Sequence, residues 1–292
     1  MSEETIPMSR SLQRPVCGFI GLGSQGAPMA RRMIDAGLDT VLWARRPETL
    51  EPYRGTRARF AASIAELAGG VDHVGLCVVT DDDVRQVCDQ LIPALRPGCI
   101  VAIHSTVHPD TCRAVETQAA ARGVRVIDAP VSGGEPGAQA GTLTVMVGGD
   151  PADLAIVRPV FETFARLIVH LGPVGTGQHA KLINNTLLAA NLGLAHAALE
   201  AGATLGVDQA ALVELLLASS GRSLAVEIRG RMPSPGAFTL GGRLLAKDLR
   251  ILGAVLGQGD PAFGRLNEAA SPFLDLVLAG SPAAEPRPEP SS

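Results

Sequence analysis

Residues 16–37 read VCGFIGLGSQGAPMARRMIDAG, and this stretch decides the fold. A short apolar run leads into the turn Gly21-Leu22-Gly23-Ser24-Gln25-Gly26, after which the pattern is that of an amphipathic helix ending at Gly37. In a strand–turn–helix unit, glycines at this spacing allow a tight turn, the approach of a pyrophosphate to the backbone, and close packing of helix on strand. We therefore predict a dinucleotide site here, rather than a glycine turn that only connects two elements.

The end of the next predicted strand, Thr40–Ala44, bears on which dinucleotide is bound. Arg45 and Arg46 follow it directly, and no carboxylate comes before Glu48. An Asp or Glu at this place binds the ribose hydroxyls of NAD, whereas a guanidinium suits the 2′-phosphate of NADP, which it can hold through two hydrogen bonds. The sequence favours NADP (NADPH) over NAD, and two solvated arginines in a loop are the alternative.

Further along the chain, β-branched runs alternate with helical patterns as far as about residue 175, which is typical of a parallel α/β sheet. The predicted strands are Val16–Gly21, Thr40–Ala44, His73–Val79, Cys99–His104, Val124–Ala129, Thr142–Gly149 and Leu167–Gly172. After Val207 the periodicity is only helical. An apolar stretch between these parts predicts one helix from about Gln178 to Leu205, about 40 Å long at 1.5 Å per residue.

We therefore expect an α/β Rossmann-type N-terminal domain followed by an all-α C-terminal domain, with the long helix joining them. The predicted boundaries are a flexible tail over 1–14, the NAD(P)-binding domain over 15–175, the helical domain over 176–280 and a disordered, Pro-rich tail over 281–292. Apolar residues occur all round the long helix. Because the remaining helical residues cannot easily cover it, we expect a homodimer or higher homo-oligomer.

Composition narrows the class of protein. The chain has 292 residues, of which 46% are hydrophobic and 18% charged, as in a globular protein with a large core. A net charge of −4 and only 3% aromatic residues give no support to nucleic acid or an anionic membrane as a partner. The long helix carries too many polar groups for an ordinary membrane span. An odd number of cysteines, five, without a CxxC pair indicates reduced thiols, and we expect a cytoplasmic protein.

Four segments carry a resemblance to a known family. They are GFIGLGSQGAPMARRM, the run Asp128-Ala129-Pro130-Val131-Ser132-Gly133-Gly134, the run Gly175-Thr176-Gly177-Gln178-His179-Ala180-Lys181-Leu182-Ile183-Asn184-Asn185, and Phe238 with Lys247-Asp248-Leu249. In this order they resemble the β-hydroxyacid dehydrogenases, which include 3-hydroxyisobutyrate dehydrogenase and tartronate semialdehyde reductase. The chain departs from the family at Gln25, where Met is frequent, and at His104, where Asp is frequent. Because both positions border the cofactor side in the family, they could alter nicotinamide contacts or substrate range.

The resemblance implies that Lys181 is the catalytic acid and base. It would take the hydroxyl proton as hydride leaves the same carbon, and return it in the reduction. Lys181 and Asn185 share one face of the long helix, and an apolar setting would lower the pKa of the lysine towards the range in which it exchanges protons at neutral pH. A lysine that only extends its ammonium group to solvent from the start of the helix is the alternative.

Binding of the substrate acid group is assigned by the same resemblance to Ser132, Gly133 and Gly134. A hydroxyl and successive backbone N–H groups form a concavity suited to a carboxylate, and a plain glycine turn is the alternative. Asn185 would hydrogen-bond the substrate, and Lys247 would lie at the site or else pair with Asp248 or a neighbouring acid. The resemblance further implies cofactor contacts from Val79, Thr106 and Lys247.

We expect no metal site. His104 and His108 are spaced like ligands, but they follow a strand and precede Pro109, so a helix is not expected there. His179 points to a different helix face from Lys181. The predicted function is NADP-dependent interconversion of a short β-hydroxy acid, a small carboxylate, with its semialdehyde or keto acid. An imine reductase-like enzyme and a non-catalytic dinucleotide-binding protein are the alternatives, and the presence of Lys181 argues against both.

Overall fold

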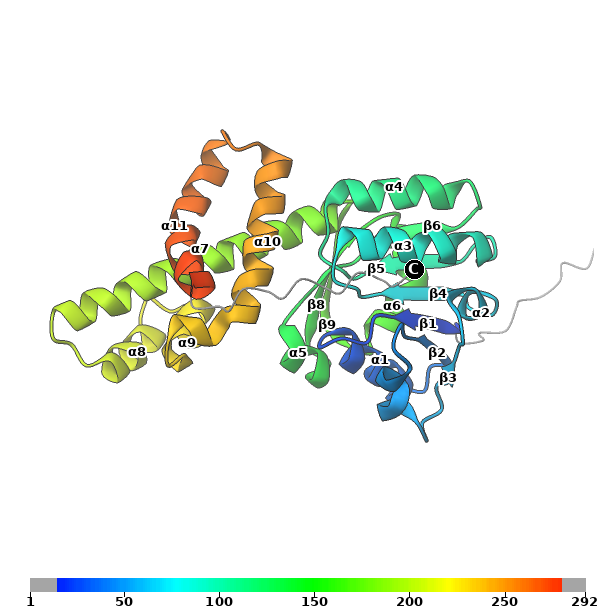
Figure 1. Ribbon diagram of the computed structural model, residues 1–292, viewed down its shortest axis with the longest axis horizontal. Helices are drawn as coiled ribbons and strands as arrows, with labels where there is room; N and C mark the ends of the chain where they lie inside the picture. The colour runs from blue at the N-terminus through cyan, green and yellow to red at the C-terminus, as the bar shows by residue number, and fades with distance from the viewer. Residues whose placement is uncertain (1–14, 280–292) are drawn as a thin grey trace, which may run out of the picture. The chain divides into compact units, whose positions relative to one another are not determined.

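The computed structural model describes residues 15–279, which form two compact units divided between Lys181 and Leu182 (Figure 1). The predictions for 1–14 and 281–292 lie outside the described residues. The first unit is an α/β domain and the second is all-helical, as the sequence predicts. None of the helices over 15–279 is long and apolar enough to cross a membrane.

The sheet of the first unit contains nine strands within the described range. They are β1 (Cys17–Ile20), β2 (Thr40–Trp43), β3 (Arg59–Phe60), β4 (His73–Leu76), β5 (Ile100–Ile103), β6 (Arg125–Asp128), β7 (Val131–Ser132), β8 (Leu143–Gly148) and β9 (Ala165–Gly172). Their order is β3-β2-β1-β4-β5-β6-β8-β7, with β9 also paired to β8. After β1, strands β2 and β3 are added on one side, and β4, β5 and β6 are then added on the other, so the strand order changes direction between β1 and β4. In sheets of this kind, ligands bind at this point, outside the carboxyl ends of the strands.

Strand pairing departs from the sequence prediction at one end. From β3 to β6 the strands are parallel as predicted, but β8 runs antiparallel to β6 and β7. The predicted parallel arrangement is therefore wrong at β8, which is parallel to β9 but not to β6 or β7. The two-residue strands β3 and β7 were not predicted, because so short a segment has no readable alternation.

Helices cover both faces of this sheet. They are α1 (Gly26–Asp35), α2 (Ile64–Ala68), α3 (Asp81–Leu91), α4 (Pro109–Ala120), α5 (Gly134–Ala140) and α6 (Pro151–Phe161). Alternate residues of a strand point to opposite faces. On β5, Val101 and Ile103 accordingly pack in the core shared with α2, α3 and α4, whereas Ile100 and Ala102 pack in the core shared with α1, α5 and α6.

The second unit is built on helices only, within the residues described. They are the C-terminal part of α7 (Thr176–Thr204), then α8 (Gln209–Ala218), α9 (Leu224–Arg231), α10 (Thr239–Leu256) and α11 (Pro261–Ala279). Three short 3-10 turns complete the two units: η1 (Pro47–Tyr53), η2 (Ile92–Ala94) and η3 (Pro235–Phe238).

Within the second unit, Gly193 of α7 lies so close to Ala269 of α11 that a Cβ atom at position 193 would collide with the Ala269 carbonyl oxygen. The core contains Leu192, Leu252 and Phe273.

Candidate active site

The glycine-rich turn joins β1 to α1 at the reversal point of the sheet. Gly21 has a φ of +99°, and a side chain there would collide with the backbone carbonyl of Cys77, at the end of β4. Gly26 opens α1, where a Cβ would collide with the Gly21 carbonyl oxygen. A Cβ at Gly23 meets no atom of the described residues within 4 Å. The turn is thus closely packed at Gly21 and Gly26 and open at Gly23, as a backbone that receives a pyrophosphate requires.

Two arginines extend into solvent beyond the end of β2. The Arg45 side chain is 64% exposed, and its Nη2 lies 3.1 Å from Asp83 Oδ1. The Arg46 side chain is 79% exposed, and its Nε lies farther, 3.9 Å, from Glu48 Oε1. Asp83 also caps α3 in a capping box with Thr80, so this carboxylate is fixed in place. Ion pairs between exposed side chains are weak. Both guanidiniums are therefore accessible to solvent, and their charge and their N–H donors suit a phosphate.

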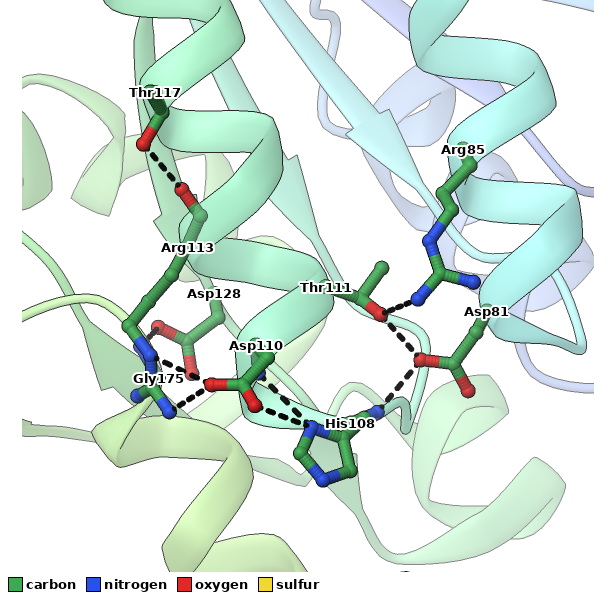
Figure 2. A network of polar contacts seen from close by, with 9 residues as sticks. All are labelled: Asp81, Arg85, His108, Asp110, Thr111, Arg113, Thr117, Asp128 and Gly175. Carbon is green, nitrogen blue, oxygen red and sulfur yellow. Dashed lines mark hydrogen bonds and ion pairs between the residues drawn. The ribbon is translucent and has the colours of Figure 1, made fainter.

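The loops after β4 and β5 are joined to each other by hydrogen bonds. The Val78 N–H donates to Ser105 Oγ over 2.8 Å, while the neighbouring Val79 side chain is 60% exposed. Asp81 Oδ1 accepts from the His108 N–H and from Thr111 Oγ1, at 2.9 Å and 2.6 Å (Figure 2). These bonds fix the two loops that carry Val79 and Thr106, the residues predicted to contact the cofactor.

The His104 side chain is buried in the core of the first unit. Its side chain is 2% exposed and lies in the apolar core, with its ring 5.3 Å from that of Phe161 and 5.7 Å from that of Phe164. Burial lowers the pKa of His104 to about 4, so the imidazole is neutral at physiological pH, and its Nδ1 lies 2.8 Å from the Ala129 carbonyl oxygen. The expectation that this position borders the cofactor side stays a prediction, while the His104 side chain itself packs in the core beside Phe19.

Ser132, Gly133 and Gly134 form the junction between β7 and α5. Ser132 pairs with Thr144 of β8, and the glycines have φ values of +126° and +62°. L-residues rarely adopt these angles, so glycine is required for the chain to turn sharply into α5. Ser132 and Gly134 are half-buried and Gly133 is exposed. The junction therefore presents a hydroxyl and backbone N–H groups at the surface of the first unit.

The first turn of α7 is bonded to the carboxyl ends of β5 and β6. Asp128, the last residue of β6, accepts hydrogen bonds from the Gly175 and Gln178 N–H groups, each over 2.7 Å (Figure 2 shows the bond to Gly175). Burial raises the pKa of Asp128 to about 6, and these two N–H groups oppose the rise. Lys181 follows one turn later on this anchored segment, and it is buried. Asp128 therefore fixes the start of the helix that carries the predicted catalytic lysine.

Asn185 lies one further turn along α7 and is fixed from α10. Its Nδ2 donates to Asp248 Oδ2 over 2.6 Å, and its Oδ1 accepts from Asn184 over 3.1 Å. The Lys247 ammonium lies 3.3 Å from Asp248 Oδ1, so the ion pair that the sequence left as an alternative is present. Asp248 is 2% exposed. Within the second unit, this buried carboxylate therefore holds the Asn185 amide and pairs with the Lys247 ammonium.

Two family models together span most of the chain. Residues 16–172 match the NAD binding domain of 6-phosphogluconate dehydrogenase, and residues 175–273 match the NAD-binding domain of NADP-dependent 3-hydroxyisobutyrate dehydrogenase. The chain is 36% identical over 243 residues to the NAD-dependent L-serine dehydrogenase of Pseudomonas aeruginosa, covering 79% of this chain and 82% of that one. It is 35% identical to the 3-hydroxyisobutyrate dehydrogenase of the same organism, with the same coverage.

The chain belongs to the 3-hydroxyisobutyrate dehydrogenase family. It is an NAD(P)-dependent 3-hydroxyacid dehydrogenase, an enzyme that acts on a CH–OH group. The solved structure of Mycobacterium tuberculosis 3-hydroxyisobutyrate dehydrogenase with L-serine matches with a TM-score of 0.79 and 29% identity, over 90% of this chain and 94% of that one. An imine reductase from Myxococcus stipitatus, at 18% identity and a TM-score of 0.56, shares the fold alone.

Three further residues of this family member were not assigned a role from the sequence. Asp128 and Gln178 lie inside the quoted motifs, but their partners on neighbouring strands and loops are up to 73 positions away. Asp248 was considered only as a partner of Lys247, and its bond to Asn185 spans 63 positions. A polar residue in or next to an otherwise apolar strand or helix was the signal available, and it does not identify the partner.

Histidine and cysteine side chains of the described residues form no grouping with Asp or Glu that could hold a metal ion. His108 precedes α4 and caps it through Nδ1, which lies 3.2 Å from the Asp110 N–H, whereas His104 is in the core. His179 is half-buried, and its pKa is lowered by burial and by Arg113. All five cysteines are free, and burial raises the pKa of the Cys77 thiol to about 12.

Proposed function

We propose that the chain interconverts a short β-hydroxy acid with its semialdehyde or keto acid, prefers NADP, and uses Lys181 as general acid and base. The observation that carries the proposal is the pair Lys181 and Asn185, both buried, one helical turn apart on α7. Lysine side chains are seldom buried in folded proteins, so a buried lysine indicates a specific role. Here the first turn of the helix is anchored through Asp128, and Asn185 is oriented by Asp248.

In the proposed reaction, each group has one task. Bound nicotinamide supplies the chemistry of hydride transfer to and from the carbon that bears the hydroxyl. Lys181 Nζ accepts the hydroxyl proton during oxidation, so that the C–O bond becomes a carbonyl, and returns it to the carbonyl oxygen during reduction. Asn185 hydrogen-bonds the same end of the substrate. Ser132 with the Gly133 and Gly134 N–H groups binds the carboxylate, and Lys247 contributes positive charge.

The preference for NADP is supported by Arg45 and Arg46, which are both more than half exposed beyond β2. The match of residues 175–273 to a model described as NADP-dependent agrees with it. The L-serine dehydrogenase relative is NAD-dependent, so the dinucleotide has to be measured on this chain. We propose that Gly21, Leu22, Gly23, Ser24, Gln25 and Gly26 hold the pyrophosphate, with further contacts from Val79, Thr106 and Lys247.

The test is a substrate panel with a lysine variant. NADP⁺ reduction is measured with 3-hydroxyisobutyrate and L-serine, and NADPH oxidation with the corresponding semialdehydes and with cyclic imines. We expect turnover of the hydroxy acids and semialdehydes only. Lys181→Ala should lower kcat by about 10²–10⁴-fold, the usual contribution of a positioned acid–base group, without altering NADPH binding. Turnover of imines, or of no substrate, would favour the alternatives.

We also propose that the protein assembles as a dimer or higher homo-oligomer through the helical unit. Ile183, Leu187 and Leu194 follow one side of α7 and are 52%, 49% and 60% exposed. Helix α8 contains no buried residue, although most of its residues are apolar. Apolar surface of this extent is usually covered by a partner, and a second copy is the simplest one. Five free cysteines, four of them buried, agree with a reducing compartment, and we propose the cytoplasm.

A further inference from the structure

Gln178 is a fully buried amide that uses both ends of its side chain. It lies in the first turn of α7 and is 0% exposed. Its Oε1 accepts from the Val107 N–H over 3.1 Å, and its Nε2 donates to the Ser105 carbonyl oxygen over 2.8 Å. Its own backbone N–H donates to Asp128. A buried amide with both ends bonded cannot rotate, because any other orientation leaves a donor or an acceptor unsatisfied at a cost of about 1–3 kcal/mol.

These bonds link the helix to the loop after β5, and through it to the loop after β4. Ser105 receives the Nε2 bond at its carbonyl oxygen, and its Oγ accepts from the Val78 N–H over 2.8 Å. Ser105 is 3% exposed, so water does not compete for these groups. One continuous chain of hydrogen bonds therefore runs from the loop of Val79, through the loop of Thr106, to the first turn of α7.

The geometry of an α-helix connects this chain to the lysine. Residues three apart lie on neighbouring positions of one face, about 4.5 Å apart along the axis. Lys181 is three residues after Gln178. Close packing leaves the first turn little freedom, since a side chain at Gly177 would collide with the Met146 carbonyl oxygen and one at Gly148 with the Asp128 carboxylate. A shift of Gln178 would therefore displace the Lys181 backbone with it.

We propose that Gln178 is a positioning residue. It fixes where Lys181 lies along the axis of α7 and how the helix is rotated about that axis, relative to the two cofactor-side loops. The inference rests on the proposed role of Lys181 as proton donor and acceptor. Gln178 does not itself touch the reacting atoms. Its effect should appear in kcat, because a misplacement of about 1 Å can cost about 10²-fold in rate.

The experiment is a double-mutant cycle on the full chain, measured with the substrate that the panel identifies. Gln178→Ala should lower kcat by about 10–100-fold, while KM and the affinity for NADPH change by less than about threefold. In the Lys181→Ala background the same substitution should leave the residual kcat within about twofold, since the group that it positions is gone. Thr176→Ala is the matched control, because it removes the 2.8 Å bond to the Pro173 carbonyl oxygen in the same turn without touching the loops. It should retain native kcat.

The Gln178→Glu variant is measured as a function of pH, because a purely structural role of Gln178 would not make the ratio of its kcat to the native kcat depend on pH. A protonated Glu has the shape and bonding of Gln, with a hydroxyl to donate to Ser105 and a carbonyl oxygen for Val107. Burial raises the pKa of such a group, and its titratable neighbours are Asp128, whose pKa is about 6 in the native protein too, and the Cys112 thiol. The kcat of this variant relative to native should be near one at about pH 5.5 and fall as the pH rises, with circular dichroism unchanged.

Four results would overturn the inference: native kcat in Gln178→Ala, an equal fold-loss in the Lys181→Ala background, an equal loss in Thr176→Ala, or a pH-independent ratio for Gln178→Glu. Native activity of Lys181→Ala alone would instead refute the proposed function, and the inference with it. The two failures are therefore distinguishable in one set of proteins.

Discussion

Replacing His104 by Asn tests how this buried imidazole sets the acid stability of the first unit. His104 lies among the rings of Phe19, Phe161 and Phe164, and its pKa is lowered to about 4 by burial. The ordinary pKa of about 6.5 returns on unfolding. Because the unfolded chain binds the proton more tightly, stability is complete above about pH 6.5 and is lost as the pH falls towards 4. An Asn amide retains a donor for the Ala129 carbonyl oxygen and does not titrate.

The magnitude follows from the two pKa values. At pH 4.5 the imidazole is almost fully protonated in the unfolded chain and mostly neutral in the folded one, which costs about 2–3 kcal/mol. His73 acts in the same direction, since burial and His104 lower its pKa to about 3. The native protein should therefore lose more stability between pH 7.5 and 4.5 than His104 alone accounts for. His104→Asn should lose less than the native protein, because only His73 of the two then titrates.

Urea unfolding at pH 7.5 and 4.5 measures the effect. The substitution itself destabilises the protein at both pH values. The quantity of interest is therefore how the stability difference between variant and native changes, which should be about 2–3 kcal/mol in favour of the variant at the lower pH. Phe164→Leu alters the same cluster without removing a titratable group and should shift stability equally at both. A His104→Asn protein that loses as much stability on acidification as the native one would refute the reasoning.

Three further predictions concern the site and the assembly. Arg45→Ala or Arg46→Ala should weaken NADPH binding at least tenfold and leave NADH binding within about twofold, measured by fluorescence titration; equal native affinities for both would contradict the preference. Asp248→Ala removes the partner of Asn185 and of Lys247, so KM for the hydroxy acid should rise about tenfold or more, with NADPH affinity retained. Light scattering at micromolar concentration should give at least twice the mass of one chain, and a monomer would disprove the assembly.

The fold was largely predictable because its signals are local. A glycine pattern between β1 and α1, together with alternation and helical periodicity, depends on neighbours within a few residues, and the seven predicted strands were all found. The errors arose where no local signal exists. β7 has two residues and owes its place to pairing with β8, and the antiparallel direction of β8 is decided by pairing partners rather than by its composition.

His104 shows that a sequence motif predicts the position of a residue in the fold but not the direction of its side chain. Its position after β5 was predicted correctly, but its side chain points into an aromatic core built from Phe19 and from Phe161 and Phe164, more than fifty residues further on. The direction of a side chain at a strand end depends on what packs beneath it. The sequence near position 104 contains none of those rings.

The sequence by itself determined the order of elements, the glycine-rich turn, the two arginines beyond β2 and the spacing of Lys181 and Asn185 on one helix. These depend on local geometry, in which the covalent chain fixes the distance between the residues concerned. Only the tertiary structure decided that Asp128 and Gln178 anchor the first turn of α7, and that Asp248 orients Asn185. Buried polar groups must be paired, but their partners come from segments that meet only when the chain has folded.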